Sequence, residues 1–133
     1  MCEEKGNAKL ITTVVLSILL IHIHIHTANA TSYTVGDSSG WTFNVAGWEK
    51  GKPFKAGDTL GCPNFSTFFA YVVGQHNTVV VDKASYDSCS VPPGAPTYSS
   101  GNDQLTLKKG PNYFICGIRG HCEAGMKIAP VAA

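Results

Sequence analysis

Residues 116–126, CGIRGHCEAGM, place three chemically active side chains at regular intervals. His121 follows Cys116 by five residues, Met126 follows His121 by five, and Cys122 stands directly after the histidine. A thiol, an imidazole and a thioether in one short segment are all potential ligands of a soft or borderline metal ion. The spacing therefore raises the question of whether this segment is a metal site.

The alternatives to a metal site explain only part of the pattern. Residues 31–133 contain four cysteines, and the halves of disulfides in a small secreted domain can pair in three ways. That interpretation leaves His121 and Met126 without a role. Structural zinc takes four Cys or His ligands, usually with a close C-x₂₋₄-C pair, and no such pair is present.

Copper makes use of every scarce residue. The only histidines in residues 31–133 are His76 and His121, and the only methionine there is Met126. Two imidazoles and one thiolate in a trigonal arrangement, with a long and weak axial thioether, form a type 1 copper site. We therefore predict one type 1 copper ion held by His76, Cys116, His121 and Met126.

Short strands must position these ligands. Runs of β-branched and aromatic residues, separated by clusters of Gly, Pro, Asn and Asp, predict about seven strands. These strands are expected at 32–35, 41–45, 67–73, 77–81, 104–107, 112–118 and 126–131. One helical turn is expected at 86–89, and no amphipathic helix is evident. The pattern indicates an all-β sandwich or barrel, and Trp41, Trp48, Phe43 and Phe114 are predicted to be core aromatics.

The first thirty residues are predicted to be a signal peptide that is removed. Lys5 and Lys9 precede the apolar run 11–21, and Ala28-Asn29-Ala30 supplies small residues at the −3 and −1 positions of a cleavage site. The alternating IHIHIH tract at 21–26 falls within this segment. Residues 31–133 then form one domain.

The charge of residues 31–133 is nearly balanced. Eight Lys and Arg residues face seven Asp and Glu residues, which gives a net charge of +1. This balance provides no electrostatic footprint for nucleic acid or for a membrane surface. We therefore expect a soluble, secreted monomer without a membrane anchor.

The mature segments resemble those of the phytocyanins, the plant blue-copper group of the cupredoxins, and most closely the plantacyanin (basic blue protein) branch. The segments that carry the resemblance are YTVGDSSGWTFN, KPFKAGDTL, GQHN, VVVD, YDSCSVPPGA, SGNDQLTL, KGPNYFICG and GHCEAGMKIA. The spacing of His76, Cys116, His121 and Met126 is the ligand pattern of that family. The resemblance implies a cupredoxin-like Greek-key β-sandwich with three strong ligands and Met126 in the axial position.

The same resemblance implies a disulfide and a function. Cys89 and Cys122 stand where the family places its disulfide, which leaves Cys116 as the thiolate. A phytocyanin is expected to carry single electrons in the extracellular space of the plant cell wall (apoplast), and not to be an enzyme. The alternative function is that of an extracellular matrix binding or signalling module in which copper is structural or dispensable.

Two segments depart from the family pattern. Residues 61–67, GCPNFST, are an extra segment with an unpaired Cys62 and an N-glycosylation sequon at Asn64. Arg119 occupies a position where the family commonly has proline. Its positive charge favours a redox partner with an acidic protein surface, while a small-molecule reductant or oxidant is the other expected type of partner.

Overall fold

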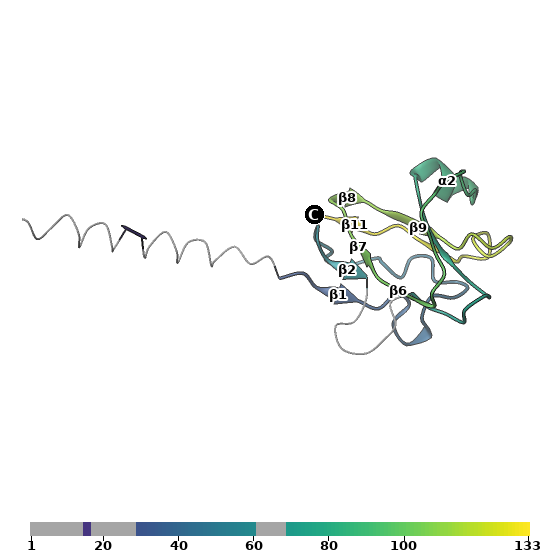
Figure 1. The fold of residues 1–133 in the computed structure, drawn as a ribbon, viewed down its shortest axis with the longest axis horizontal. Coiled ribbons are helices and arrows are strands. Elements are labelled where there is room, and N and C mark those ends of the chain that lie inside the picture. The colour runs from purple at the N-terminus through teal and green to yellow at the C-terminus, as the bar shows by residue number, and fades with distance from the viewer. Residues whose placement is uncertain (1–14, 17–28, 61–68) are drawn as a thin grey trace, which may run out of the picture.

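The computed structural model describes residues 15–16, 29–60 and 69–133 (Figure 1). Most of the predicted signal peptide (1–30) lies outside the described residues. Cys62, Asn64 and the rest of the predicted extra segment 61–67 also lie outside them.

Short strands form four sheets in the described part of the chain. The strands are β1 (Ser32–Tyr33), β2 (Thr59–Leu60), β3 (Phe69–Ala70), β4 (Thr78–Val81), β5 (Thr97–Tyr98), β6 (Asn102–Asp103), β7 (Leu105–Thr106), β8 (Gly110–Pro111), β9 (Tyr113–Ile115), β10 (Lys127–Ile128) and β11 (Val131–Ala132). Two larger sheets have the orders β1-β2-β7 and β10-β9-β4-β5, and β11-β8 and β3-β6 are separate pairs. β1 and β2 are parallel, and every other pair is antiparallel.

The predicted all-β fold class is confirmed. The predicted strands are shorter in the structure, and additional two-residue strands such as β5 and β8 accompany them. Frequent Gly and Pro residues explain the difference, because they bend the chain out of the sheet ladders after a few residues.

The four-stranded sheet buries both of its faces. In the antiparallel pair β4–β9, Val80 lies opposite Phe114 and Val79 lies opposite Ile115. Because side chains alternate along a strand, Phe114 faces the main core while Val79 and Ile115 face the other side. The main core also contains Trp41, which is 1% exposed, so the predicted core role of Trp41 and Phe114 is confirmed.

The second face of this sheet is covered by a helix. Helix α2 (Lys83–Ser88) is longer than the single turn predicted at 86–89. The side chain of Asp82 caps its first turn by accepting a hydrogen bond from the Ser85 backbone N–H at 2.8 Å. The helix ends at Cys89, whose φ of 51° is left-handed.

Residues 41–45 were predicted to be a strand, and that prediction is wrong. They form turns, and Asn44 adopts a positive φ of 59°. The Asn44 N–H donates to the Ala124 carbonyl at 3.2 Å, and the Ala46 N–H donates to the Gly125 carbonyl at 3.0 Å. The segment therefore pairs irregularly with the loop 117–125 and not with a sheet.

The C-terminus lies with β1 at one end of the domain, and the loop 117–125 lies at the other (Figure 1). The C-terminal residue is fixed beside the 54–56 turn, since Ala133 N–H donates to the Phe54 carbonyl and Ala56 N–H donates to the Ala133 carbonyl, both at 3.0 Å. None of the helices in the described ranges is long and apolar enough to cross a membrane.

Candidate metal centre

The predicted ligands lie at the ends of two paired strands. His76 comes two residues before β4, and Cys116 directly follows β9. Because β4 and β9 are antiparallel neighbours, the start of one strand lies beside the end of the other. The chain then turns through 117–125, which contains His121, and Met126 directly precedes β10.

Three predicted ligands converge on one point. The ligand atoms of His76, Cys116 and His121 all lie within 4.8 Å of one another. The two histidine Nδ1 atoms are 3.1 Å apart, and the Cys116 Sγ lies 3.6 Å from the His121 Nδ1. The two imidazoles therefore face each other through Nδ1 beside the sulfur, and two nitrogens with one thiolate form a donor set that fits copper.

Met126 lies beside this cluster through its backbone. The Cys116 N–H donates to the Met126 carbonyl at 2.9 Å, and the Met126 N–H donates to the His121 carbonyl at 3.0 Å. The Met126 side chain is 0% exposed and belongs to the main core. Its position fits both a packing role and that of a weak axial ligand.

The site is buried on its sulfur side and open on its histidine side. Cys116 is 1% exposed, whereas His76 and His121 are half-buried. Burial, and in second place the nearby His121, lowers the pKa of His76. A lower pKa favours the neutral imidazole, which is the form that binds a metal ion.

Asn77 supports the site and was missed in the sequence. Its side-chain Oδ1 accepts a hydrogen bond from the Gly117 N–H at 2.6 Å and one from the Cys116 thiol at 3.7 Å. Its backbone carbonyl accepts from the Trp41 indole N–H at 2.9 Å. Asn77 thus connects the segment of His76 to the segment of Cys116 through hydrogen bonds. In the sequence, only its position directly after the predicted ligand His76 could have indicated this role.

The predicted Cys89–Cys122 disulfide is confirmed. The two sulfur atoms are bonded, and the bridge links residues 33 apart in the sequence. Cys116 is the free cysteine of the described residues and is buried. The bridge joins the end of helix α2 to the residue that follows His121.

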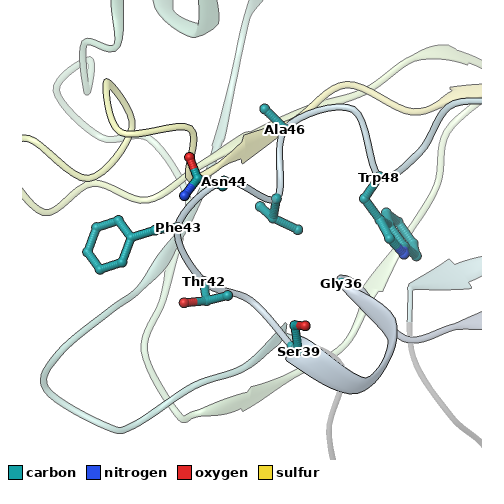
Figure 2. A pocket seen from close by; sticks show the side chains of 9 residues that line it. Gly36, Ser39, Thr42, Phe43, Asn44, Ala46 and Trp48 are labelled. Carbon is teal, nitrogen blue, oxygen red and sulfur yellow. The ribbon is translucent and has the colours of Figure 1, made fainter.

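Phe43 was predicted to be a core aromatic, and that prediction is wrong. Its side chain is 42% exposed, and its ring stands edge-on to His121 and His76 at centroid distances of 4.8 and 5.5 Å. Figure 2 shows that the ring projects from the outer side of its loop, away from a hollow of about 370 Å³ that Ser39 and Trp48 help to line. Trp48 is only half-buried, and it packs against the main core.

Tyr71 is a second aromatic residue in contact with His76. The two rings are edge-on at a centroid distance of 6.4 Å. The Tyr71 hydroxyl donates to the Tyr98 carbonyl at 2.9 Å and also contacts the buried Asp103 carboxylate. Burial and the hydrogen bond to Asp103 raise the pKa of Tyr71, so the phenol stays neutral and anchors the 71–76 loop.

The fold and the site together define the class of cupredoxin-fold blue copper proteins. The plastocyanin-like domain family matches residues 41–126, which include all four predicted ligands. This chain therefore belongs to that family, and its similarity to the relatives below places it among the phytocyanins.

The relatives are plant blue copper proteins. A basic blue protein of Arabidopsis thaliana is 44% identical over 99% of both chains, and a chemocyanin of Lilium longiflorum is 43% identical over 100% of both. The solved structure of cucumber basic protein, a blue copper protein, is 48% identical and superposes with a TM-score of 0.70. The similarity covers 77% of this chain and 100% of that one.

Proposed function

We propose that this protein is a secreted single-electron carrier that binds one type 1 copper ion through His76, Cys116 and His121. Met126 is the proposed weak axial ligand. The observation that carries the proposal is the convergence of two imidazole nitrogens and one thiol within 4.8 Å. The family of the chain supports the choice of copper.

Copper at this position supplies a one-electron couple, because nitrogen donors suit Cu(II) and sulfur donors suit Cu(I). The residues around the site hold the donors in one arrangement for both oxidation states. Asn77 fixes the Cys116 side, and the disulfide at Cys122 fixes the His121 side. A site that does not rearrange can gain and lose an electron quickly.

The surface around the histidines is suited to brief contact with a redox partner. Three exposed apolar residues contact the histidines or their backbone. The Phe43 ring contacts both imidazoles, Val73 forms a backbone bridge with His76, and the Ile118 carbonyl accepts a hydrogen bond from the His121 N–H. The exposed Arg119 lies on the same loop as His121. An apolar rim excludes water, and a positive charge attracts an acidic protein surface, which is the partner we favour over a small molecule.

Secretion to the cell wall space is part of the proposal. It rests on the predicted signal peptide and on the disulfide, since disulfides form in oxidising compartments. Turnover of a substrate is not part of it.

An optical titration tests the metal site. Adding Cu(II) to the purified protein should produce an intense blue absorption, with one copper ion bound per chain, because of charge transfer from the Cys116 thiolate. The Cys116→Ser variant should stay colourless, whereas the matched control Cys62→Ser should turn blue. A blue Cys116→Ser variant would show that the ligand assignment is wrong.

A rate measurement separates an electron carrier from a matrix-binding module. Electron self-exchange between the oxidised and reduced forms, measured by NMR line broadening, should be rapid for a carrier. A copper-loaded protein with slow self-exchange would contradict the carrier role even if the blue colour is present.

A further inference from the structure

Asp58 is a buried carboxylate that has only uncharged partners in the unprocessed chain. Its side chain is 1% exposed. Oδ1 accepts a hydrogen bond from the Thr31 backbone N–H at 2.8 Å, and Oδ2 accepts one from the Lys55 backbone N–H at 2.8 Å. The ion pairs within the described ranges, Lys52–Asp37 and Lys83–Asp87, do not include it.

A buried carboxylate without a counter-charge is costly, because desolvation penalises the ionised form. The two backbone hydrogen bonds offset part of that cost. A positive charge at either donor would offset more. Thr31 is the donor that can acquire one, since it directly follows the predicted cleavage site.

We propose that the chain is cut between Ala30 and Thr31, and that the new α-ammonium group of Thr31 becomes the counter-ion of Asp58. A signal-type endopeptidase would add water across this peptide bond. The C–N bond breaks, Ala30 keeps the carboxylate, and the Thr31 nitrogen takes up protons to become an ammonium group. An α-amine is largely protonated at neutral pH.

The local structure fits both the cut and the ion pair. Residues 29–31 are exposed, so the bond is accessible. In the uncut chain, Ala30 and Asp58 line the same hollow of about 330 Å³. Ala30 leaves with the signal peptide, so water can reach the ammonium group from that side.

The parallel pairing of β1 with β2 fixes the position of the Thr31 nitrogen. The Thr59 N–H donates to the Thr31 carbonyl at 2.9 Å, and the Ser32 and Thr59 hydroxyls are 2.8 Å apart. A cut at any other bond would leave the Thr31 nitrogen, which donates to Asp58, without a positive charge or would remove it. The full stability of the domain is then reached only after the signal peptide has been removed.

The test begins with the secreted protein. N-terminal sequencing of the product secreted from the full-length precursor should give Thr31 as the first residue. A start at any other residue overturns the proposal.

The second measurement isolates the charge. Chains beginning at Thr31 and at Ala30 keep the same hydrogen bond, but only in the first does the nitrogen that donates to Asp58 itself carry the positive charge. In urea unfolding at neutral pH, the Thr31 chain should have a folded-to-unfolded ratio roughly tenfold higher. Acetylation of its α-amine should remove that gain.

Asp58→Asn supplies the matched control. In this variant, chains starting at Thr31 and at Ala30 should have equal stabilities, because no carboxylate remains to pair with the ammonium group. Equal stabilities in the wild-type pair, or a difference that persists in the Asp58→Asn pair, would overturn the proposal. All of these measurements use copper-free protein, so their outcome is independent of the proposed electron carrier.

Discussion

Asn77 is the residue that joins the two halves of the metal centre. Its side-chain Oδ1 accepts hydrogen bonds from the Gly117 N–H and the Cys116 thiol. Its backbone carbonyl accepts one from the indole N–H of Trp41 in the core. The position of the sulfur relative to His76 therefore depends on a residue that is not itself a predicted ligand.

Replacing Asn77 with alanine should weaken the site and the fold together. The partly buried Gly117 N–H loses its acceptor, and the loss of one such hydrogen bond costs about 0.5–1.5 kcal/mol of unfolding free energy. Denaturant unfolding should report this loss, and the visible absorption of the copper form should shift. Asn102→Ala, at the exposed position of strand β6, is the control and should change neither. An unaltered Asn77→Ala variant would contradict the role of Asn77.

Met126→Gln should lower the redox potential while keeping the blue colour. A thioether is a poor donor to Cu(II), whereas an amide oxygen is harder and stabilises Cu(II). Voltammetry measures the change directly, since ~59 mV corresponds to a tenfold shift for a one-electron couple. Met126→Leu preserves the buried apolar volume without a donor and should not lower the potential; the same potential in Met126→Gln and the wild type would assign Met126 to packing alone.

The ligands could be predicted from the sequence because their residue types are metal-binding and their spacing is regular. His76, Cys116, His121 and Met126 are scarce residue types, and three of them lie in one loop. Phe43 could not be placed in the same way. An aromatic residue two positions after Trp41 has the alternating pattern of a core strand, and only the irregular pairing of its loop with Ala124 turns its ring toward the histidines.

At the scale of elements, the loop 117–125 is held from several sides. The antiparallel pair β9–β10 joins the two ends of the loop, and the disulfide links the loop to the end of α2. The 42–46 turn donates backbone hydrogen bonds to Ala124 and Gly125 of the loop. Gly125 is required where that turn approaches, because a Cβ atom there would lie 3.2 Å from the Asn44 Cα, and its φ is +82°.

Removing the disulfide should cost stability but not colour. The bridge closes a chain segment of 33 residues, and bridges of this kind contribute about 2–4 kcal/mol to the free energy of unfolding. The double variant Cys89→Ser/Cys122→Ser should therefore unfold at a lower denaturant concentration. It should still turn blue with Cu(II), because Cys116 and the backbone bonds around Met126 remain; a colourless variant would mean that the bridge alone positions His121.

Element boundaries were less predictable than element types. The runs at 77–81 and 112–118 contain β4 and β9, because their alternating apolar residues bury two faces of one sheet. Helix α2 was underestimated, although Asp82 three residues before Ser85 carries the N-cap signal. A six-residue helix has too few turns for a hydrophobic period to be visible.

At the scale of the whole molecule, the candidate metal centre and the N-terminal strand lie at different ends of the domain. The metal centre lies at the end formed by the loop 117–125, and β1 lies with the C-terminus at the other (Figure 1). The Asp58 side chain accepts hydrogen bonds from Thr31, the residue before β1, and from Lys55 in the 55–58 turn. Its backbone carbonyl accepts one from the Leu107 N–H at 2.8 Å. Because the two regions lie at opposite ends of the domain, a change at one should have little effect on the other.

Removal of copper should lower the unfolding temperature without unfolding the domain. The donors are held by protein contacts, namely the Asn77 hydrogen bonds, the disulfide and the β9–β10 pair, so the copper-free protein should keep its far-UV circular dichroism. Copper that binds only the folded state adds about 2.7 kcal/mol when its free concentration is a hundred times the dissociation constant. Thermal unfolding at increasing copper concentrations measures this gain. The same gain is expected in Asp58→Asn, because that substitution acts at the opposite end, and a gain that disappears in Asp58→Asn would show that the two ends are coupled.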